Sequence, residues 1–303
     1  MSFAGDVKTE LCRLAMNRKC CVQAECYGIL LYCNTFSARE IRIITENEAL
    51  AQRLPVLFKK AFKITFDRLP EGEGKHVFAI TDREKLEIIQ QTFGGGPGSL
   101  ALHINYGVLE ERCCRVSFLR GAFLAGGSVT DPLKGYHLEL VTSHRSVSRE
   151  VYALLLDMEF SPKETERSGS SVLYFKQSNT IEDLLTTMGA PVSAMHIMEA
   201  KVEKDLRNSV NRRVNCETAN LTKVVDAAME QVAAIERLMD SELWITLPPK
   251  LRQTAKLRCD NPEATLTELA ELCEPPVTKS AMNHRLRKLM ALAGTLDQAE
   301  TEL

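Results

Sequence analysis

An internal repeat constrains the fold of this chain more than any other sequence feature. Residues Cys20–Asn34 align without a gap on residues Cys113–Gly127, at an offset of 93 positions. Each copy has a Cys-Cys pair, a glycine seven residues after the second cysteine, and then an apolar run. This period is longer than that of a solenoid unit, so it predicts two halves of one pseudo-symmetric domain.

The order of the expected elements also repeats. Each half continues with an alternating strand, a helix, a hairpin and a closing helix. In the first half the strand is 41–45, the helix 49–62, the hairpin 63–66 with 77–80 around a turn at 70–74, and the closing helix 83–93. In the second half the strand is 138–142, the helix 147–160, the hairpin 163–166 with 172–175 around a turn at 168–171, and the closing helix 180–188. The pattern predicts an α+β fold, with two α/β halves that each carry a small antiparallel sheet.

Four segments are expected along the chain. Residues 1–93 and 100–190 form the two halves, residues 196–240 a helical linker, and residues 248–293 a helix-turn-helix domain. The glycine-rich stretch 94–99 lacks the Lys-Ser/Thr ending of a phosphate loop, so it is expected to be a linker.

Composition is that of an ordinary globular protein, with 45% hydrophobic and 26% charged residues among 303. The start of the chain has no basic-then-apolar signal pattern and no apolar run is long enough to span a membrane, which predicts a cytoplasmic protein without a membrane partner. The net charge of −2 means that any nucleic-acid surface is a local patch.

The ten cysteines are expected to be reduced and to act as small core hydrophobes, as for Cys12, Cys26 and Cys33. No C-x-x-C spacing occurs, and we expect no metal and no cofactor. The Cys20-Cys21 and Cys113-Cys114 pairs are the only cysteines at which zinc would be sought.

Two helices, 196–213 and 218–240, are expected before the C-terminal domain, joined by a connector at residues 208–220 that is rich in Asn and Arg. A solvated turn and a phosphate contact by Arg212 and Arg213 are equally good interpretations of this connector.

Three short helices are expected within residues 248–293. Pro248 and Pro249 start the first, and Thr265 with Glu268 forms a capping box at the start of the second. The third runs from near Thr278 to about Leu292, with one apolar stripe at Met282, Leu286, Leu289 and Ala293.

The opposite face of that third helix has the side chains of a recognition helix. It has short hydrogen-bonding groups near the helix start, bases farther along, and no acid between Pro275 and Leu292. The predicted contacts to double-stranded DNA are Lys279, Ser280, Asn283, His284, Arg285, Arg287 and Lys288, with phosphate contacts from Arg252, Lys256 and Arg258. The alternative is a protein-docking module with a basic face.

Small residues four apart, such as Ala24 with Gly28 and Ser117 with Gly121, predict that the two repeat helices pack closely. The second copy, Leu119–Ser128, resembles the LAGLIDADG motif of homing endonucleases. That resemblance implies two motif helices packed at a pseudo-twofold axis, and a carboxylate at each helix end that binds Mg²⁺.

The positions of those carboxylates are Cys33 and Gly126 in this chain. A thiol is a poor ligand for a hard cation and glycine has no side chain, so we expect no catalytic residue and no enzyme. Glu25, Glu40 and Asp131 are close in sequence but lie away from the helix-end position.

From Asp6 to Leu289 the chain resembles the WhiA family of Gram-positive bacteria, most specifically in the segments 118–132, 199–220 and 265–289. The resemblance implies a degenerate homing-endonuclease domain joined to a helix-turn-helix. It also implies a nucleoid-associated transcriptional regulator tied to sporulation, cell division or chromosome segregation, with a transcription or division protein as a further partner and no small-molecule substrate. The competing hypotheses are an active Mg²⁺-dependent endonuclease that uses displaced acids such as Asp131, and a scaffold that binds division proteins through the repeat domain.

Overall fold

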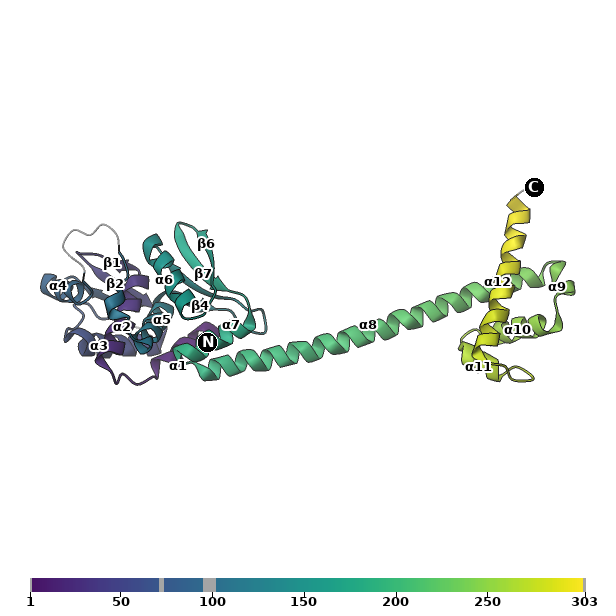
Figure 1. Cartoon of the computed structure of the whole chain (residues 1–303), viewed down its shortest axis with the longest axis horizontal. Helices are drawn as coiled ribbons and strands as arrows, with labels where there is room; N and C mark the ends of the chain where they lie inside the picture. The colour runs from purple at the N-terminus through teal and green to yellow at the C-terminus, as the bar shows by residue number, and fades with distance from the viewer. Residues whose placement is uncertain (1, 71–73, 95–101, 302–303) are drawn as a thin grey trace. The chain divides into compact units, whose positions relative to one another are not determined.

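The computed structural model describes residues 2–70, 74–94 and 102–301. The chain divides into two compact units, Met1–Asp205 and Leu206–Leu303 (Figure 1). The expected linker at 94–99 lies outside the described residues except for Gly94, and so does most of the expected turn at 70–74. Among the described residues, no helix is both long and apolar enough to cross a membrane.

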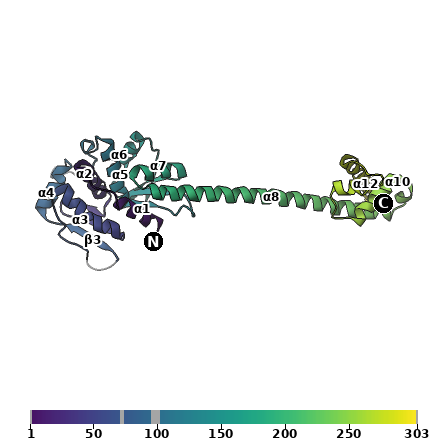
Figure 2. The same cartoon turned by 90° about the horizontal axis from the view of Figure 1, so that it is seen from below.

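Two helices, α2 (Lys19–Tyr32) and α5 (Arg112–Gly126), pack side by side at the centre of the first unit. They come from the two copies of the repeat, and both views show them enclosed by the other elements of this unit (Figures 1 and 2). Ten of the eleven residues from Val22 to Tyr32 are buried, with Gln23 as the exception, so α2 is a core helix. The helix α1 (Phe3–Cys12) packs against α5 and α3.

The first half continues with a three-stranded antiparallel sheet and two helices. These are β1 (Thr35–Phe36), β2 (Ile41–Thr45), α3 (Glu48–Phe62), β3 (His76–Ile80) and α4 (Arg83–Thr92), with strand order β1-β2-β3. The predicted strand at 63–66 is wrong. Lys63 ends α3 in the left-handed region at φ 62°. In the described residues between α3 and β3, the chain pairs with β3 at a single bridge, between Arg68 and Ala79. Ile64 and Phe66 are buried without strand pairing. The alternation of apolar residues that suggested a strand here is explained by packing of these two side chains in the core.

The second half has a four-stranded antiparallel sheet of order β4-β5-β7-β6. Its elements are the 3-10 helix η1 (Tyr106–Val108), β4 (Gly127–Val129), β5 (Leu138–Thr142), α6 (Arg145–Asp157), β6 (Lys163–Arg167), β7 (Ser170–Phe175) and α7 (Ser178–Met188). The predicted hairpin is confirmed, with its turn at Ser168 and Gly169, which both have positive φ. The two sheets and their helices make the predicted α+β fold.

The helix α8 (Pro191–Met239) is continuous, so the predicted connector at 208–220 is wrong. No glycine or proline follows Pro191 within this helix to break it. The Arg213 Nε lies 3.0 Å from Glu217 Oε1, an i,i+4 pair that favours the helix through the Asn-rich stretch. Arg212 and Arg213 therefore lie on helical turns and not in a loop.

The second unit contains four further helices around its own core. They are α9 (Leu243–Thr246), α10 (Pro249–Asp260), α11 (Leu266–Glu271) and α12 (Lys279–Thr301). The Thr265–Glu268 capping box is present at the start of α11, as predicted. The third helix was expected to end near Leu292, but α12 continues to Thr301 because no proline follows and Gly294 alone does not stop it.

Candidate nucleic-acid interface and the degenerate catalytic position

Close contact between α2 and α5 depends on two glycines. A Cβ atom at Gly28 would fall on the backbone carbonyl of Phe118, and one at Gly121 would fall on the carbonyl of Glu25. Because neither backbone can move away without separating the helices, glycine is required at both positions. The predicted packing role of these small residues is confirmed.

The two positions at which the motif family has carboxylates lie at matching ends of these helices. Cys33 directly follows α2, and Gly126 is the last residue of α5. The Cys33 thiol lies 3.2 Å from the carbonyl oxygen of Leu30 and 3.1 Å from that of Thr35, and it donates its single proton to one of them. Burial raises the pKa of Cys33 to about 12, so the thiol stays protonated at neutral pH.

Gly126 has no room for a side chain. A Cβ at this position would meet the carbonyl oxygen of Val141 and would lie 2.8 Å from Cδ1 of Tyr32. Tyr32 is itself buried at the end of α2. The space that a carboxylate would need is therefore filled by the opposite helix and the second sheet.

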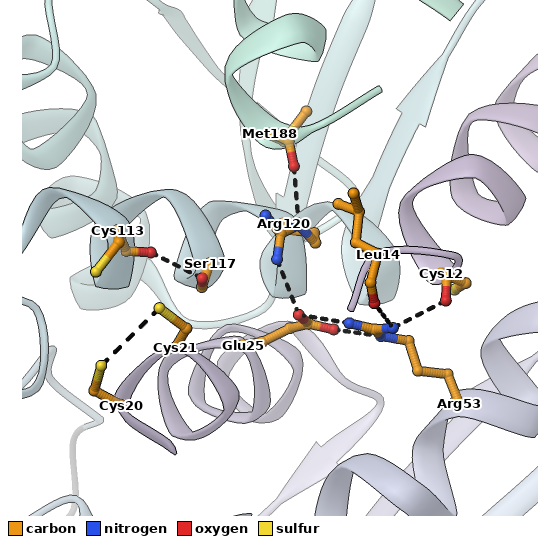
Figure 3. A network of polar contacts seen from close by, with 10 residues as sticks. All are labelled: Cys12, Leu14, Cys20, Cys21, Glu25, Arg53, Cys113, Ser117, Arg120 and Met188. Carbon is orange, nitrogen blue, oxygen red and sulfur yellow. Dashed lines mark hydrogen bonds and ion pairs between the residues drawn. The ribbon is translucent and has the colours of Figure 1, made fainter. Parts of the chain in front are cut away.

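The acids near the motif are held in other roles. Glu25 is buried on α2, where its Oε1 lies 2.7 Å from Arg53 Nε of α3 and its Oε2 lies 3.2 Å from Arg120 Nη1 of α5. Figure 3 shows the Glu25 carboxylate between these two guanidinium groups. Asp131 accepts the backbone N–H of Leu133 at 2.9 Å and so belongs to a turn.

The arginines of this network also bind the backbone. Arg53 Nη1 donates to the carbonyls of Cys12 at 2.9 Å and Leu14 at 2.7 Å, and Arg120 Nε donates to Met188 at 2.9 Å. Sequence reasoning did not find this network. The available signal was a carboxylate inside the otherwise apolar stretch of α2, because a buried charge requires a partner.

In the second unit, α12 has one buried and one exposed face. Met282, Leu286, Leu289 and Ala293 are almost completely buried, which confirms the predicted apolar stripe. The exposed residues Lys279, Ser280, His284, Arg287 and Lys288 form what we call the basic face. Among the residues that the structure describes, none of the three bases on this face makes an ion pair.

Two of the predicted contact residues are less exposed. Asn283 and Arg285 are half-buried, and Arg285 Nη1 lies 3.4 Å from Cys273 Sγ, at the edge of the core. On α10, Lys256 is exposed and Arg252 is half-buried. On α8, Arg212 and Arg213 are both exposed.

The predicted phosphate contact by Arg258 is wrong. Arg258 is buried, its Nε lies 2.9 Å from Gln231 Oε1 of α8, and its Nη1 donates to the carbonyl of Ala264 at 2.6 Å. Burial lowers the pKa of this guanidinium from its usual value. Arg258 therefore joins α10 to α8 and to the turn before α11, and it is not available to DNA.

The capping box that begins α11 is complete. Thr265 N–H donates to Glu268 Oε2 at 2.7 Å, and Glu268 N–H donates to Thr265 Oγ1 at 3.3 Å. The hydrogen bond from the Thr265 backbone lowers the pKa of Glu268. This cap sets where the helix before α12 begins.

Comparison with known families identifies both parts of the chain. Residues 115–207 match the WhiA LAGLIDADG-like domain, and residues 210–293 match the WhiA C-terminal HTH domain. The chain is thus a LAGLIDADG-like protein with a C-terminal helix-turn-helix, a domain that implies DNA binding.

Relatives align with almost the whole of this chain. The probable cell division protein WhiA of Alkaliphilus oremlandii (strain OhILAs) is 37% identical over 323 residues, which cover 99% of each chain. The protein of the same name from Ruminiclostridium cellulolyticum is 38% identical over 305 residues, 97% of each chain. This chain belongs to the WhiA family, as its sequence resemblance predicted.

A solved structure has the same fold. The crystal structure of full-length DUF199/WhiA from Thermatoga maritima aligns with a TM-score of 0.61 at 24% sequence identity, covering 97% of this chain and 99% of that one.

Proposed function

We propose that this protein is a sequence-specific, double-stranded DNA-binding transcriptional regulator of cell division, chromosome segregation or sporulation, and that it has no nuclease activity. The observation that carries the proposal is the basic face of α12, whose bases have no ion-pair partner among the described residues while the opposite stripe is buried. Such a face presents hydrogen-bond donors and positive charge to a major groove.

The contacts divide into two kinds. The first kind is base readout, because a recognition helix reads base edges with residues near its start. The residues proposed for this role lie within the first nine residues of α12: Ser280, Asn283, His284 and Arg287. Lys279, Lys288, Lys256 and Arg252 are proposed to contact phosphates, with Arg212, Arg213 and Arg285 adding positive charge.

The proposed lack of cleavage is supported by the catalytic position itself. Gly126 is enclosed by Tyr32 and Val141, and Cys33 is a protonated thiol. Glu25 is neutralised by two arginines and Asp131 caps a turn. The first unit is proposed to act instead as a platform for DNA or for a transcription or division protein.

The test begins with selection of binding sequences from a random duplex library by the full chain. We expect Arg287→Ala to weaken binding to the selected site by about 1–3 kcal/mol, and Arg287→Lys to lose base preference while keeping the charge. Lys250→Ala removes an exposed base of α10 outside the proposed contact set and is the matched control.

Three outcomes would contradict the proposal. One is that Arg287→Ala, Asn283→Ala and Lys288→Ala leave both the affinity and its salt dependence unchanged. The second is cleavage of a long duplex by the wild-type chain with Mg²⁺ but not with EDTA. The third is normal cell division in a strain whose variant has lost DNA binding, which would favour the scaffold hypothesis.

A further inference from the structure

Four cysteines from the two copies of the repeat lie together at the starts of α2 and α5. Cys20 and Cys21 are the second and third residues of α2, and Cys113 and Cys114 have the same positions in α5. Their four sulfur atoms all lie within 4.8 Å of one another. Figure 3 shows Cys20 and Cys21 facing Cys113 across the helix pair. Pseudo-symmetry thus joins two pairs that are 93 positions apart in sequence.

These cysteines differ from the core cysteines of the same unit. Cys26 and Cys33 are buried, as expected for small hydrophobes, whereas Cys20 is exposed and Cys21 and Cys113 are half-buried. The expectation that all ten cysteines fill the core is therefore wrong for Cys20, Cys21 and Cys113, and also for the exposed Cys216 of α8. Within the cluster Cys114 is buried, while the other three cysteines are partly or fully exposed, so solvent reaches the site.

The spacing of the sulfurs suits one tetrahedral metal ion. Thiolates bound to Zn²⁺ at about 2.3 Å stand about 3.8 Å from each other. The sulfurs of Cys20 and Cys21 are 4.0 Å apart, and no pair in the cluster exceeds 4.8 Å. Every sulfur–sulfur distance is therefore within about 1 Å of the spacing in a tetrathiolate site. An iron–sulfur cluster contains several ions and requires thiolates that are farther apart.

Positive charge around the cluster offsets the negative charge of a zinc tetrathiolate. Two helix N-termini converge on it, and each contributes positive potential from its free backbone N–H groups. Arg18 Nη1 lies 3.6 Å from Cys113 Sγ, and Lys19 and Arg112 are the first residues of the two helices. A zinc ion with four thiolates has a net charge of −2, which these bases offset.

We propose that Cys20, Cys21, Cys113 and Cys114 bind one Zn²⁺ ion as a structural tetrathiolate site. The ion joins the first turns of α2 and α5 and so links the two halves of the LAGLIDADG-like domain at one end of their helix pair. This site lies in the first unit and the basic face lies in the second. A failure of the zinc proposal would therefore leave the proposed function unaffected, and the reverse also holds.

The test uses the full chain, purified with a reductant, loaded with Zn²⁺ and passed through a desalting column. We expect one zinc per chain by mass spectrometry of the metal. Replacement by Co²⁺ should give the visible bands of a tetrahedral ion and a thiolate-to-cobalt charge-transfer band. Cys20→Ser should weaken zinc binding by more than about tenfold. Loss of a residue that only hydrogen-bonds to a metal ligand already lowers metal affinity by about that factor, and Cys20 is a direct ligand.

Two controls keep the result interpretable. Cys20 is exposed, so its replacement leaves the core intact, whereas replacing Cys114 alters a buried position. Cys216→Ser removes an exposed cysteine of α8 outside the cluster and should keep the full zinc content. An equal loss of zinc in both variants would overturn the proposal, because it would show non-specific thiol binding.

Intrinsic fluorescence locates the effect of the ion. All six tyrosines lie between residues 27 and 174 in the first unit, and the single tryptophan, Trp244, lies in the second. Zinc should raise the unfolding temperature reported by tyrosine, EDTA should reverse that rise, and the Trp244 transition should not move. Absence of bound zinc with all ten thiols titrating as free, or disulfides within the cluster in the reduced preparation, would overturn the proposal.

Discussion

The carboxylate of Glu25 and the guanidinium of Arg53 form a bidentate pair inside the first unit, with N–O distances of 2.7 and 3.0 Å and both side chains 3% exposed. Arg120 binds the same carboxylate from α5. Glu25 therefore connects α2 to both α3 and α5, and its two partners also donate to three backbone carbonyls at the ends of α1 and α7.

Glu25→Ala should destabilise the first unit by about 3–5 kcal/mol, because two buried guanidinium groups lose their counter-charge. Denaturant unfolding followed by tyrosine fluorescence measures this loss, and the Trp244 transition should stay in place. Arg83→Ala is the control, since it removes an exposed i,i+4 pair with Glu87 and should cost less than about 1 kcal/mol. Equal effects of the two variants would contradict the structural role of the network.

A carboxylate at the motif position should not restore nuclease activity. In Gly126→Asp, with or without Cys33→Asp, the new side chain meets Tyr32 and Val141, and overpacking of this kind costs about 1–3 kcal/mol. We expect a lowered tyrosine-reported unfolding temperature and no cleavage of duplex DNA with Mg²⁺.

The matched control for that position is Gly135→Asp, where an added Cβ meets nothing within 4 Å. It should leave the unfolding temperature nearly unchanged. Mg²⁺-dependent cleavage by the Gly126→Asp, Cys33→Asp chain would show that the space at the helix ends opens readily.

The capping box predicts how the second unit responds to acid. The folded-state pKa of Glu268 is lowered, so its contribution is present above its unfolded pKa of about 4.5 and is lost as pH falls through the folded value. Glu268→Gln should remove this part of the acid dependence of the Trp244-reported unfolding temperature. Thr265→Ala should cost about 1 kcal/mol at neutral pH. An identical pH profile for wild type and Glu268→Gln would contradict the assigned role.

Two arginines of the second unit should separate stability from DNA binding. Arg258→Ala leaves the carbonyl of Ala264 and the side chain of Gln231 without their donor, and it should lower stability by about 2 kcal/mol. Arg287→Ala changes an exposed side chain and should alter stability by less than about 0.5 kcal/mol. Unfolding reported by Trp244 and binding to the duplex are measured on both variants. The division would be contradicted if Arg287→Ala lowered stability and Arg258→Ala weakened DNA binding without lowering stability.

Several elements were predictable because their causes are local or periodic. The repeat indicated that α2 and α5 are equivalent, and the small residues four apart indicated their close contact. The capping box at Thr265 and the stripe on α12 follow from hydrogen bonds and spacings within one or two helical turns. The helix ends and strand pairing at 63–66 were less predictable, because a left-handed Lys63 and core packing decided them.

The sequence by itself determined the repeat, the two-part organisation and the loss of both motif carboxylates, since these depend only on residue types and their order. Tertiary structure alone decided that Arg258 lies inside while Arg287 lies outside, because both are bases on helices with similar neighbours in sequence. It alone placed Glu25 between Arg53 and Arg120, and Cys20 and Cys21 against Cys113 and Cys114. Such contacts join residues far apart in the chain, so their geometry exists only once the two halves have packed.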